Sequence, residues 1–317
     1  QPLPIPFSNY RKPTMRCVAL LFACIVLSGC TQEASIPLDP EPAAISLSGD
    51  SLFSPKPSQD LVERYDVRRE AYVVDPTNIE NIIWFGRFMA YVGDYEEAIS
   101  IYTQGMDLYP DDARLYRHRG HRYISVRKFN EAIADLEKAA ELIEGTNNEI
   151  EPDGMPNAQG IPVSSLHGNI WYHLGLAYYL KHDLEGALRG FNNGRATSEN
   201  ADNLVSTSHW LYMIHRRMGN TEAANRVLDP ISSDMPIIEN VAYHQLLLFY
   251  KGELSEEDLT GEGSAGDAIT YGVANWHLYN GHQERAKEVY DELLNGSSWA
   301  SFGYIAAESD VIEYLEP

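Results

Sequence analysis

The chain has 317 residues and is strongly acidic, with 46 Asp and Glu residues against 24 Lys and Arg residues and a formal net charge of −22. A surface this acidic disfavours nucleic acid and anionic lipid headgroups as partners, because both carry charge of the same sign. Hydrophobic residues make up 44% of the chain, which at this length is enough for a sizeable core. The composition therefore indicates a folded protein that does not bind nucleic acid.

The first thirty residues carry the pattern of an export signal. Arg11, Lys12 and Arg16 precede an apolar run at residues 18–27, which is too short to span a bilayer as a stable helix. The run ends in Leu-Ser-Gly-Cys, with Cys30 in the last position. This pattern resembles the bacterial lipoprotein signal, in which cleavage falls before the cysteine and lipid is attached to its sulfur.

The lipoprotein resemblance implies that residues 15–29 are removed and that Cys30 is the lipidation site. Residues 1–14 are then expected to be an upstream extension outside the native protein. Residues 30–58 are rich in Pro, Ser and Ala without helical periodicity, so we expect the lipidated cysteine to be followed by a flexible linker. The implied location is the bacterial cell envelope, at the outer membrane facing the periplasm in a cell with two membranes. Ordinary secretory cleavage with a free Cys30 is the alternative.

Small residues recur at a fixed spacing along the middle of the chain. Gly86, Gly120 and Gly175 are each followed by an alanine twelve residues later; the first two glycines are 34 residues apart, and the third is displaced by 21 more. Small residues let paired helices approach closely, while large apolar side chains fill the remaining space. The recurring positions are Ile82, Phe85, Gly86, Met89, Gly93, Ala98, Tyr102, Gly105 and Pro110, then Tyr116, Arg119, Gly120, Tyr123, Ala132, Leu136 and Ala139, then Trp171, Leu174, Gly175, Tyr178, Ala187, Phe191 and Gly194.

These positions resemble the tetratricopeptide repeat (TPR), a 34-residue helix-turn-helix unit that buries its core by stacking on its neighbours. The resemblance implies an all-α fold over residues 59–317, a right-handed superhelical α-solenoid of about five to six hairpins with a C-terminal capping helix. Weaker matches extend the array beyond the third copy. The units are expected near 79–112, 113–146, 168–201, 205–237 and 267–296, with an insertion loop at 147–167.

The TPR resemblance also implies that the first helix of each hairpin faces a concave groove. Applied to this sequence, the family geometry gives a basic and aromatic lining, which suits a protein or peptide segment that bears carboxylates. The implied groove residues are Arg87, Arg114, Arg117, His121, Tyr172, Tyr179, His209, Arg216 and Arg217, together with Tyr271 and Tyr279. The alternative is that the arginines are solvated surface charges and that the aromatic residues belong to the core.

The insertion loop is the most unusual segment of the array. It places Glu149, Glu151 and Asp153 among several prolines and glycines. Long loops inside compact arrays are uncommon and often functional. One hypothesis is that these carboxylates fold back over Arg114 and Arg117 and occupy the groove until a partner displaces them. The alternative is an inert surface loop.

The sequence shows no convergent set of catalytic residues. It has no His-Glu-x-x-His pair, no cysteine cluster, no Gly-x-Ser-x-Gly elbow and no phosphate-binding loop. Four histidines, at positions 118, 121, 167 and 173, could approach one another from neighbouring units, so a histidine-based metalloenzyme remains a minor alternative. We expect a chain that is not an enzyme and needs no cofactor or metal.

The combined expectation is a membrane-tethered TPR scaffold of the bacterial cell envelope, which holds a protein or peptide partner in its groove. The alternative from a different class is a permanent structural subunit of an envelope assembly complex.

Overall fold

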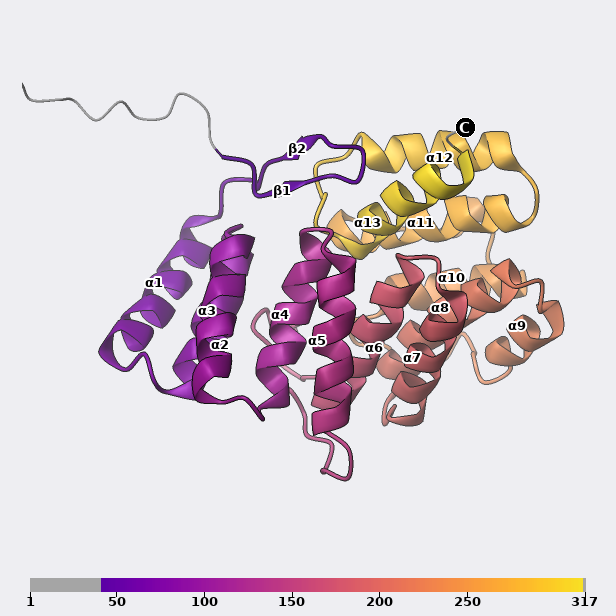
Figure 1. Cartoon of the computed structure of the whole chain (residues 1–317). Helices are drawn as coiled ribbons and strands as arrows, with labels where there is room; N and C mark the ends of the chain where they lie inside the picture. Colours follow the sequence, from indigo (N-terminus) through magenta and orange to yellow (C-terminus); the bar gives the residue numbers. More distant parts are fainter. Residues whose placement is uncertain (1–40, 316–317) are drawn as a thin grey trace, which may run out of the picture. The chain divides into compact units, whose positions relative to one another are not determined.

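A computed structural model describes residues 41–315, and Figure 1 shows that this part of the chain is built almost entirely from packed helices. The proposed signal sequence and Cys30 lie outside the described residues. No helix in the described part is both long and apolar enough to cross a membrane. The helices are α1 (Gln59–Val74), α2 (Ile79–Tyr91), α3 (Tyr95–Leu108), α4 (Ala113–Ser125), α5 (Phe129–Leu142), α6 (Leu166–Tyr179), α7 (Leu184–Ala196), α8 (Ala201–Arg217), α9 (Thr221–Leu228), α10 (Val241–Lys251), α11 (Gly263–Tyr279), α12 (Gln283–Leu294) and α13 (Phe302–Asp310).

Consecutive helices pair as antiparallel hairpins, and each hairpin stacks on the next. The pairs are α2 with α3, α4 with α5, α6 with α7, α8 with α9, and α11 with α12, while α3 packs on α4, α5 on α6 and α7 on α8. The predicted all-α solenoid is confirmed. Helix α10 packs on α8 and α11, and a short 3₁₀ turn (Glu256–Asp258) takes the place of a partner helix.

The repeated glycines lie where the two helices of a hairpin are closest. A Cβ atom added at Gly86 would lie 2.6 Å from the ring of Tyr102, and one added at Gly175 would lie 2.8 Å from Phe191. In the third hairpin the backbones themselves meet, because a Cβ at Gly190 would lie 2.5 Å from the Cα of Gly175. Such distances leave no room for a methyl group. The glycine spacing in the sequence therefore reflects the close packing of the two helices in each hairpin.

The turn between the helices of a hairpin contains one residue in the left-handed region. Gly93, Gly219 and Gly281 occupy it in three hairpins, with φ of 97°, 74° and 82°. The second and third hairpins instead use Arg127 and His182, with φ of 63° and 58°. A left-handed conformation costs a non-glycine residue about 1 kcal/mol. These two turns therefore need a compensating interaction.

The segment before α1 packs against the segment that precedes α13. Strands β1 (Ala44–Ile45) and β2 (Ser51–Leu52) pair antiparallel, and Ala44 and Leu52 are buried with Trp299. The indole Nε1 of Trp299 donates a hydrogen bond to the carbonyl oxygen of Phe53 at 2.8 Å. The expectation of a flexible linker at 30–58 is thus wrong for its second half, because apolar residues there are buried against the C-terminal segment.

Candidate functional site

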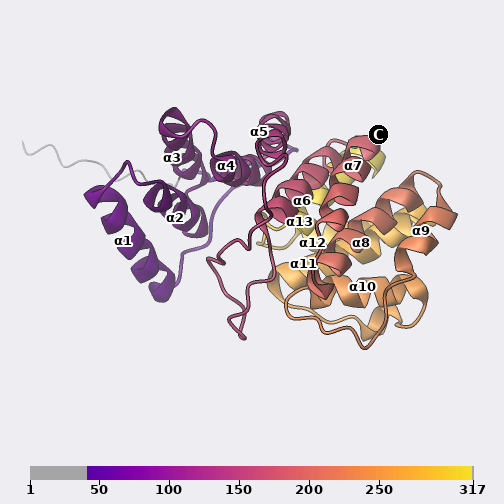
Figure 2. The ribbon, with the colours of Figure 1, turned by 90° about the horizontal axis from the view of Figure 1, so that it is seen from below.

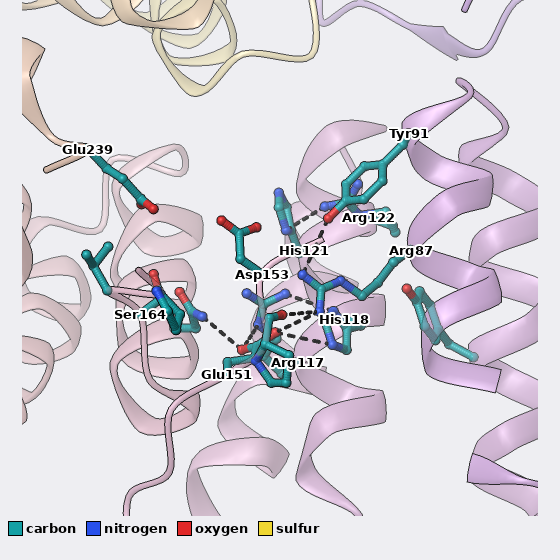
Figure 3. Close-up of a pocket in the computed structure, with 15 residues that line it drawn as sticks. Arg87, Tyr91, Arg117, His118, His121, Arg122, Glu151, Asp153, Ser164 and Glu239 are labelled. Atoms are coloured by element: carbon teal, nitrogen blue, oxygen red, sulfur yellow. Dashed lines mark hydrogen bonds and ion pairs between the residues drawn. The ribbon is translucent and has the colours of Figure 1, made fainter. Parts of the chain in front are cut away.

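A cavity of about 200 Å³ lies where α2, α4 and α6 face the insertion loop (Figure 3). Helices α2 and α4 supply most of its basic side chains. Residues of these two helices in its wall are Arg87, Tyr91, Arg117, His118, His121 and Arg122. In Figure 2 the loop between α5 and α6 lies between α2 and α6. Three of the predicted groove residues, Arg87, Arg117 and His121, therefore meet at one site.

Glu151 of the insertion loop is buried in this cavity, with only 8% of its side chain exposed. One carboxylate oxygen, Oε2, lies 3.2 Å from Nε of Arg117 and accepts a hydrogen bond from Asn169 at 2.8 Å. The other, Oε1, lies 3.4 Å from Nε2 of His118 and 3.9 Å from Nη1 of Arg87. The loop therefore places a carboxylate among the groove arginines, and Figure 3 shows these contacts as dashed lines.

Backbone contacts hold the residues on either side of Glu151. The amide of Glu151 donates to the carbonyl oxygen of Ser164 at 3.0 Å. Arg87 donates to the carbonyl oxygen of Pro152 at 2.7 Å, and Arg64 of α1 donates to that of Gly154. This short segment of the loop is thus held by its main chain as well as by its carboxylate.

Three histidines beside the arginines are held in the neutral state. Burial, followed by the positive charges of Arg117 and Arg122, holds the pKa values of His118, His121 and His173 well below the ordinary value of 6.5. A neutral imidazole can accept a hydrogen bond. Nη1 of Arg117 accordingly lies 2.8 Å from Nδ1 of His118, and Nη2 of Arg122 lies 2.5 Å from Nδ1 of His121. The histidines thus help to orient the arginines.

The rings of His121 and His173 are 4.3 Å apart, as the sequence allowed for histidines of neighbouring units. Among residues 41–315 no group of three or more His, Cys, Asp and Glu side chains is arranged to hold a metal ion.

Arg114 lies at the edge of its helix and not in the cavity. It pairs with Asp112 of its own helix start at 2.7 Å and with Glu80 of α2 at 2.6 Å. Hydrogen bonding to these acids raises the pKa of Arg114. The hypothesis that the loop carboxylates cover Arg114 is therefore wrong, and the surface-charge interpretation holds for this arginine. For Arg117 the loop contact is present.

Tyr179, His209 and Arg217 lie in the interior instead of the groove. Tyr179 and His209 are 1% and 0% exposed, and Arg217 pairs with the buried carboxylate of Asp310. Burial lowers the pKa of His209 to about 3. Tyr271 is also buried and donates to Asp310 at 2.9 Å. The expectation that these four residues line a groove is corrected, because the helices that carry them are covered by later elements of the chain.

Arg216 joins two helices of the array. It donates to Asn280 Oδ1 at 2.7 Å and lies 4.6 Å above the ring of Tyr279. This residue and Tyr279 are therefore engaged in packing between α8 and α11 and are not part of the cavity lined by Arg87 and Arg117.

Tyr172 belongs to a second cavity of about 250 Å³, which adjoins the first. Its hydroxyl accepts a hydrogen bond from Trp210 Nε1 at 2.8 Å and lies 2.9 Å from the hydroxyl of Tyr243. Glu239 lines both cavities, and Phe302 of α13 contributes an apolar wall to the second. The site therefore offers a basic half and a half that combines aromatic and amide side chains.

Several residues that line the cavities were not predicted from the sequence. Tyr91 and Arg122 lie on the same helices as predicted groove residues, so the helical periodicity could have found them. Glu239 and Phe302 come from distant segments, and no local pattern marks them as neighbours of the site.

Comparisons with known proteins give a likeness of fold. No family model and no curated protein matches the chain. Among solved structures, a tetratricopeptide repeat protein from Parabacteroides merdae is 17% identical with a TM-score of 0.48, covering 78% of this chain and 92% of that one. YrrB, described as a TPR protein with an unusual peptide-binding site, is 17% identical with a TM-score of 0.42, covering 73% and 92%. MamA is 14% identical with a TM-score of 0.43, covering 62% and 92%.

Proposed function

We propose that this protein is a non-catalytic binding scaffold that holds an acidic segment of a partner protein or peptide in the cavity between α2, α4 and α6. The single observation that carries the proposal is the convergence of Arg87, Arg117 and Arg122 on one cavity in a chain of net charge −22. Converging arginines in a partly buried site bind carboxylates strongly, because their guanidinium groups donate paired hydrogen bonds at low solvent exposure.

The neighbouring cavity around Tyr172 favours the interpretation that the ligand is an extended segment and not a single ion. Aromatic rings and amide side chains there can contact apolar and backbone groups of a peptide. A segment that spans both cavities would place carboxylates on the arginines and its other residues along Tyr172 and Phe302.

We propose further that the scaffold is tethered to a membrane of the bacterial envelope by lipid on Cys30. The support is the sequence pattern of basic residues, a short apolar run and Leu-Ser-Gly-Cys. Mass spectrometry of the protein expressed in bacteria should find diacylglycerol on Cys30, and a Cys30→Ser variant should leave the membrane fraction. A membrane-bound Cys30→Ser variant would contradict the tether and leave the groove proposal intact.

Partner capture tests the scaffold. Immobilised residues 31–317 are incubated with envelope extract, alongside an Arg87→Gln/Arg122→Gln variant and an Arg114→Gln/Arg189→Gln control. The control removes the same charge from arginines that pair with acids outside the cavity. A protein retained by the parent and the control but lost by the cavity variant would support the groove. Equal retention by all three would move the interface elsewhere.

The dependence of partner binding on salt concentration distinguishes a scaffold from a permanent subunit. A partner that exchanges in and out of the cavity should elute as ionic strength rises, since salt screens its carboxylates and the arginines whenever the contact opens to solvent. Co-purification through 1 M salt would favour the structural subunit of an envelope complex.

A further inference from the structure

The insertion loop is held in the site in the manner of a bound peptide. Residues 150–155 contain no helix or named strand, and the contacts come at successive positions along the chain. The carboxylate of Glu151 faces Arg117, the carbonyl of Pro152 accepts from Arg87, and the carbonyl of Gly154 accepts from Arg64. A peptide that binds by main-chain hydrogen bonds and one anchoring side chain has the same arrangement.

The fit of this segment is incomplete. Nε of Arg117 lies 3.2 Å from Oε2 of Glu151, and Oε1 of Glu151 lies 3.4 Å from Nε2 of His118, but neither of these two buried atoms makes a hydrogen bond of good geometry. Buried polar atoms without well-directed hydrogen bonds are costly, so a carboxylate that aligns better with these groups would be held more strongly than Glu151 is.

Like charges add to the incomplete fit. Asp153 and Glu239 both line the cavity, and in Figure 3 their carboxylates lie on the same side of Glu151. Burial and the charge of Asp153 raise the pKa of Glu239, although a hydrogen bond from Asn157 acts in the opposite direction. Repulsion between these acids opposes the position of Asp153, while the hydrogen bond from Asn157 to Glu239 holds the neighbouring part of the loop.

The base of the loop is anchored by a backbone bridge that includes the amide of Glu151. Ile150 forms a bridge with Ser165, and the amide of Leu166 donates to the carbonyl oxygen of Glu149 at 2.9 Å. The part of the loop from Pro152 to Gly160 is largely exposed. The carboxylate of Glu151 and residues 152–155 can therefore leave the cavity while the bridge and the start of α6 stay in place.

We propose that residues 151–155 are an internal pseudo-ligand, and that the partner binds by displacing their side chains and carbonyls from the cavity with an extended acidic segment of the same Glu-Pro-Asp chemistry. This inference rests on the proposed function, since it names the ligand class and the regulation of the same cavity. The loop competes at high effective concentration because it is tethered next to the site. The affinity measured for an external segment is therefore reduced by the fraction of molecules whose cavity is open.

Gly154 provides a way to open the cavity without removing a charge. A Cβ added at this residue would lie 2.5 Å from the hydroxyl of Tyr91, so a leucine fits only if the ring of Tyr91 or the loop moves. Ala158 lies in the same loop and is exposed, and a leucine there meets no such obstacle. Gly154→Leu and Ala158→Leu thus form a matched pair of variants.

The probe is a fluorescent peptide with the sequence of residues 149–155, Glu-Ile-Glu-Pro-Asp-Gly-Met, and its binding to residues 31–317 is followed by anisotropy. We expect Gly154→Leu to bind the peptide at least tenfold more tightly than the parent and Ala158→Leu do. A peptide with Gln in place of the second Glu should lose at least tenfold in affinity for Gly154→Leu. Equal affinity of all three proteins, or equal affinity of the two peptides, would overturn the inference.

A second variant keeps the inference testable if Gly154→Leu does not fold. Glu151→Gln with Asp153→Asn keeps the size of the loop and removes its carboxylates, so it should also bind the unmodified peptide more tightly than the parent. Circular dichroism and thermal unfolding establish that each variant is folded before titration. If every folded variant with a released loop fails to bind the peptide, the inference is wrong.

The partner-capture experiment and the peptide titration test different proposals, so one can fail without the other. A partner captured through Arg87 and Arg122 together with no peptide binding would leave the scaffold standing and reject the pseudo-ligand. Peptide binding with no captured partner would support the chemistry of the cavity and remove the support that capture gives to the envelope scaffold.

Discussion

The Nε atom of Arg127 lies 2.8 Å from Oε2 of Glu308 and joins the turn of the second hairpin to the last helix. Both side chains are buried, and Arg127 also donates to the carbonyl oxygen of Trp299 at 2.8 Å. His182, in the corresponding turn of the third hairpin, lies 2.8 Å from the hydroxyl of Ser309. The two non-glycine residues in left-handed turns are thus the ones that contact α13, so the contacts offset the cost of the backbone conformation.

Replacing Arg127 should destabilise the fold in a way that depends on the new residue. Arg127→Ala leaves Glu308 buried without its cation and keeps a non-glycine residue at φ of 63°, so the free energy of unfolding should fall by about 3 kcal/mol or more. Arg127→Gly loses the same pair but relieves the turn, so its loss should be smaller by about 1 kcal/mol. Urea unfolding measures both values. Equal losses would show that the turn carries no strain.

Two glycines of α7 should respond in opposite directions to alanine. Gly190→Ala places a methyl group against the backbone of Gly175, so it should lower stability by about 1–3 kcal/mol. Gly194→Ala meets only ordinary contacts, with the nearest atoms at 3.5 Å, and should raise stability by up to about 1 kcal/mol because alanine favours the helix. The shift in thermal midpoint distinguishes the two. A stabilising Gly190→Ala would contradict the close approach of α6 and α7.

The interior ion pair between Arg217 and Asp310 should matter more than a rim pair. Asp310 also accepts hydrogen bonds from Tyr271 and Tyr290 at 2.9 Å, so Asp310→Ala leaves a buried cation and two hydroxyls without their acceptor. We expect a loss of about 3–5 kcal/mol in the free energy of unfolding. Arg114→Gln, at the partly exposed rim, should cost about 1 kcal/mol or less. Chemical denaturation of the two variants tests the assignment of Arg217 to the core.

Stability should fall as the pH drops below neutrality. The pKa values of His118, His121 and His173 are well below 6.5 in the folded protein, so near and below pH 6.5 the unfolded chain binds protons that the folded chain does not. Their contribution is fully present above the unfolded pKa and is lost as the pH falls from 6.5 toward the folded values. Each histidine can add up to about 1.4 kcal/mol per pH unit to the slope.

Unfolding in urea at pH 7.0, 6.5, 6.0 and 5.5 measures this slope above the ordinary pKa values of Asp and Glu. His173→Gln should make the slope shallower, since one of the three groups is removed. His282→Gln is the control, because His282 is exposed and lies outside the cluster. The same slope in all three proteins would show that the histidine cluster does not govern the response.

The hairpins could be predicted from the sequence because their signals are local. Gly86 faces Tyr102, and Gly120 faces Leu136, both within one hairpin, so the sequence spacing directly reflects the contact. The ends of the described chain were predicted less well. The pairing of β1 with β2 depends on burial of Leu52 beside Trp299, and these residues are far apart in sequence.

The candidate site was predicted in part. Arg87, Arg117 and His121 were expected in the groove from repeat positions, and they lie together in the cavity. The same positional rule was wrong for Tyr179 and His209. It predicts which face of a helix a residue lies on, but it does not predict which other elements pack over that face. Later elements pack over them, and their burial is a property of the whole array.

The sequence by itself determined the helix-turn-helix period, the close packing of paired helices and the presence of an acidic insertion between the second and third hairpins. These features depend on contacts within about 34 residues, where side-chain size and turn chemistry act directly. Only the tertiary structure decided which arginine meets Glu151 and which pairs at the rim. That choice depends on how successive hairpins stack and on where the loop and α13 return to the array, which are long-range contacts that no local pattern encodes.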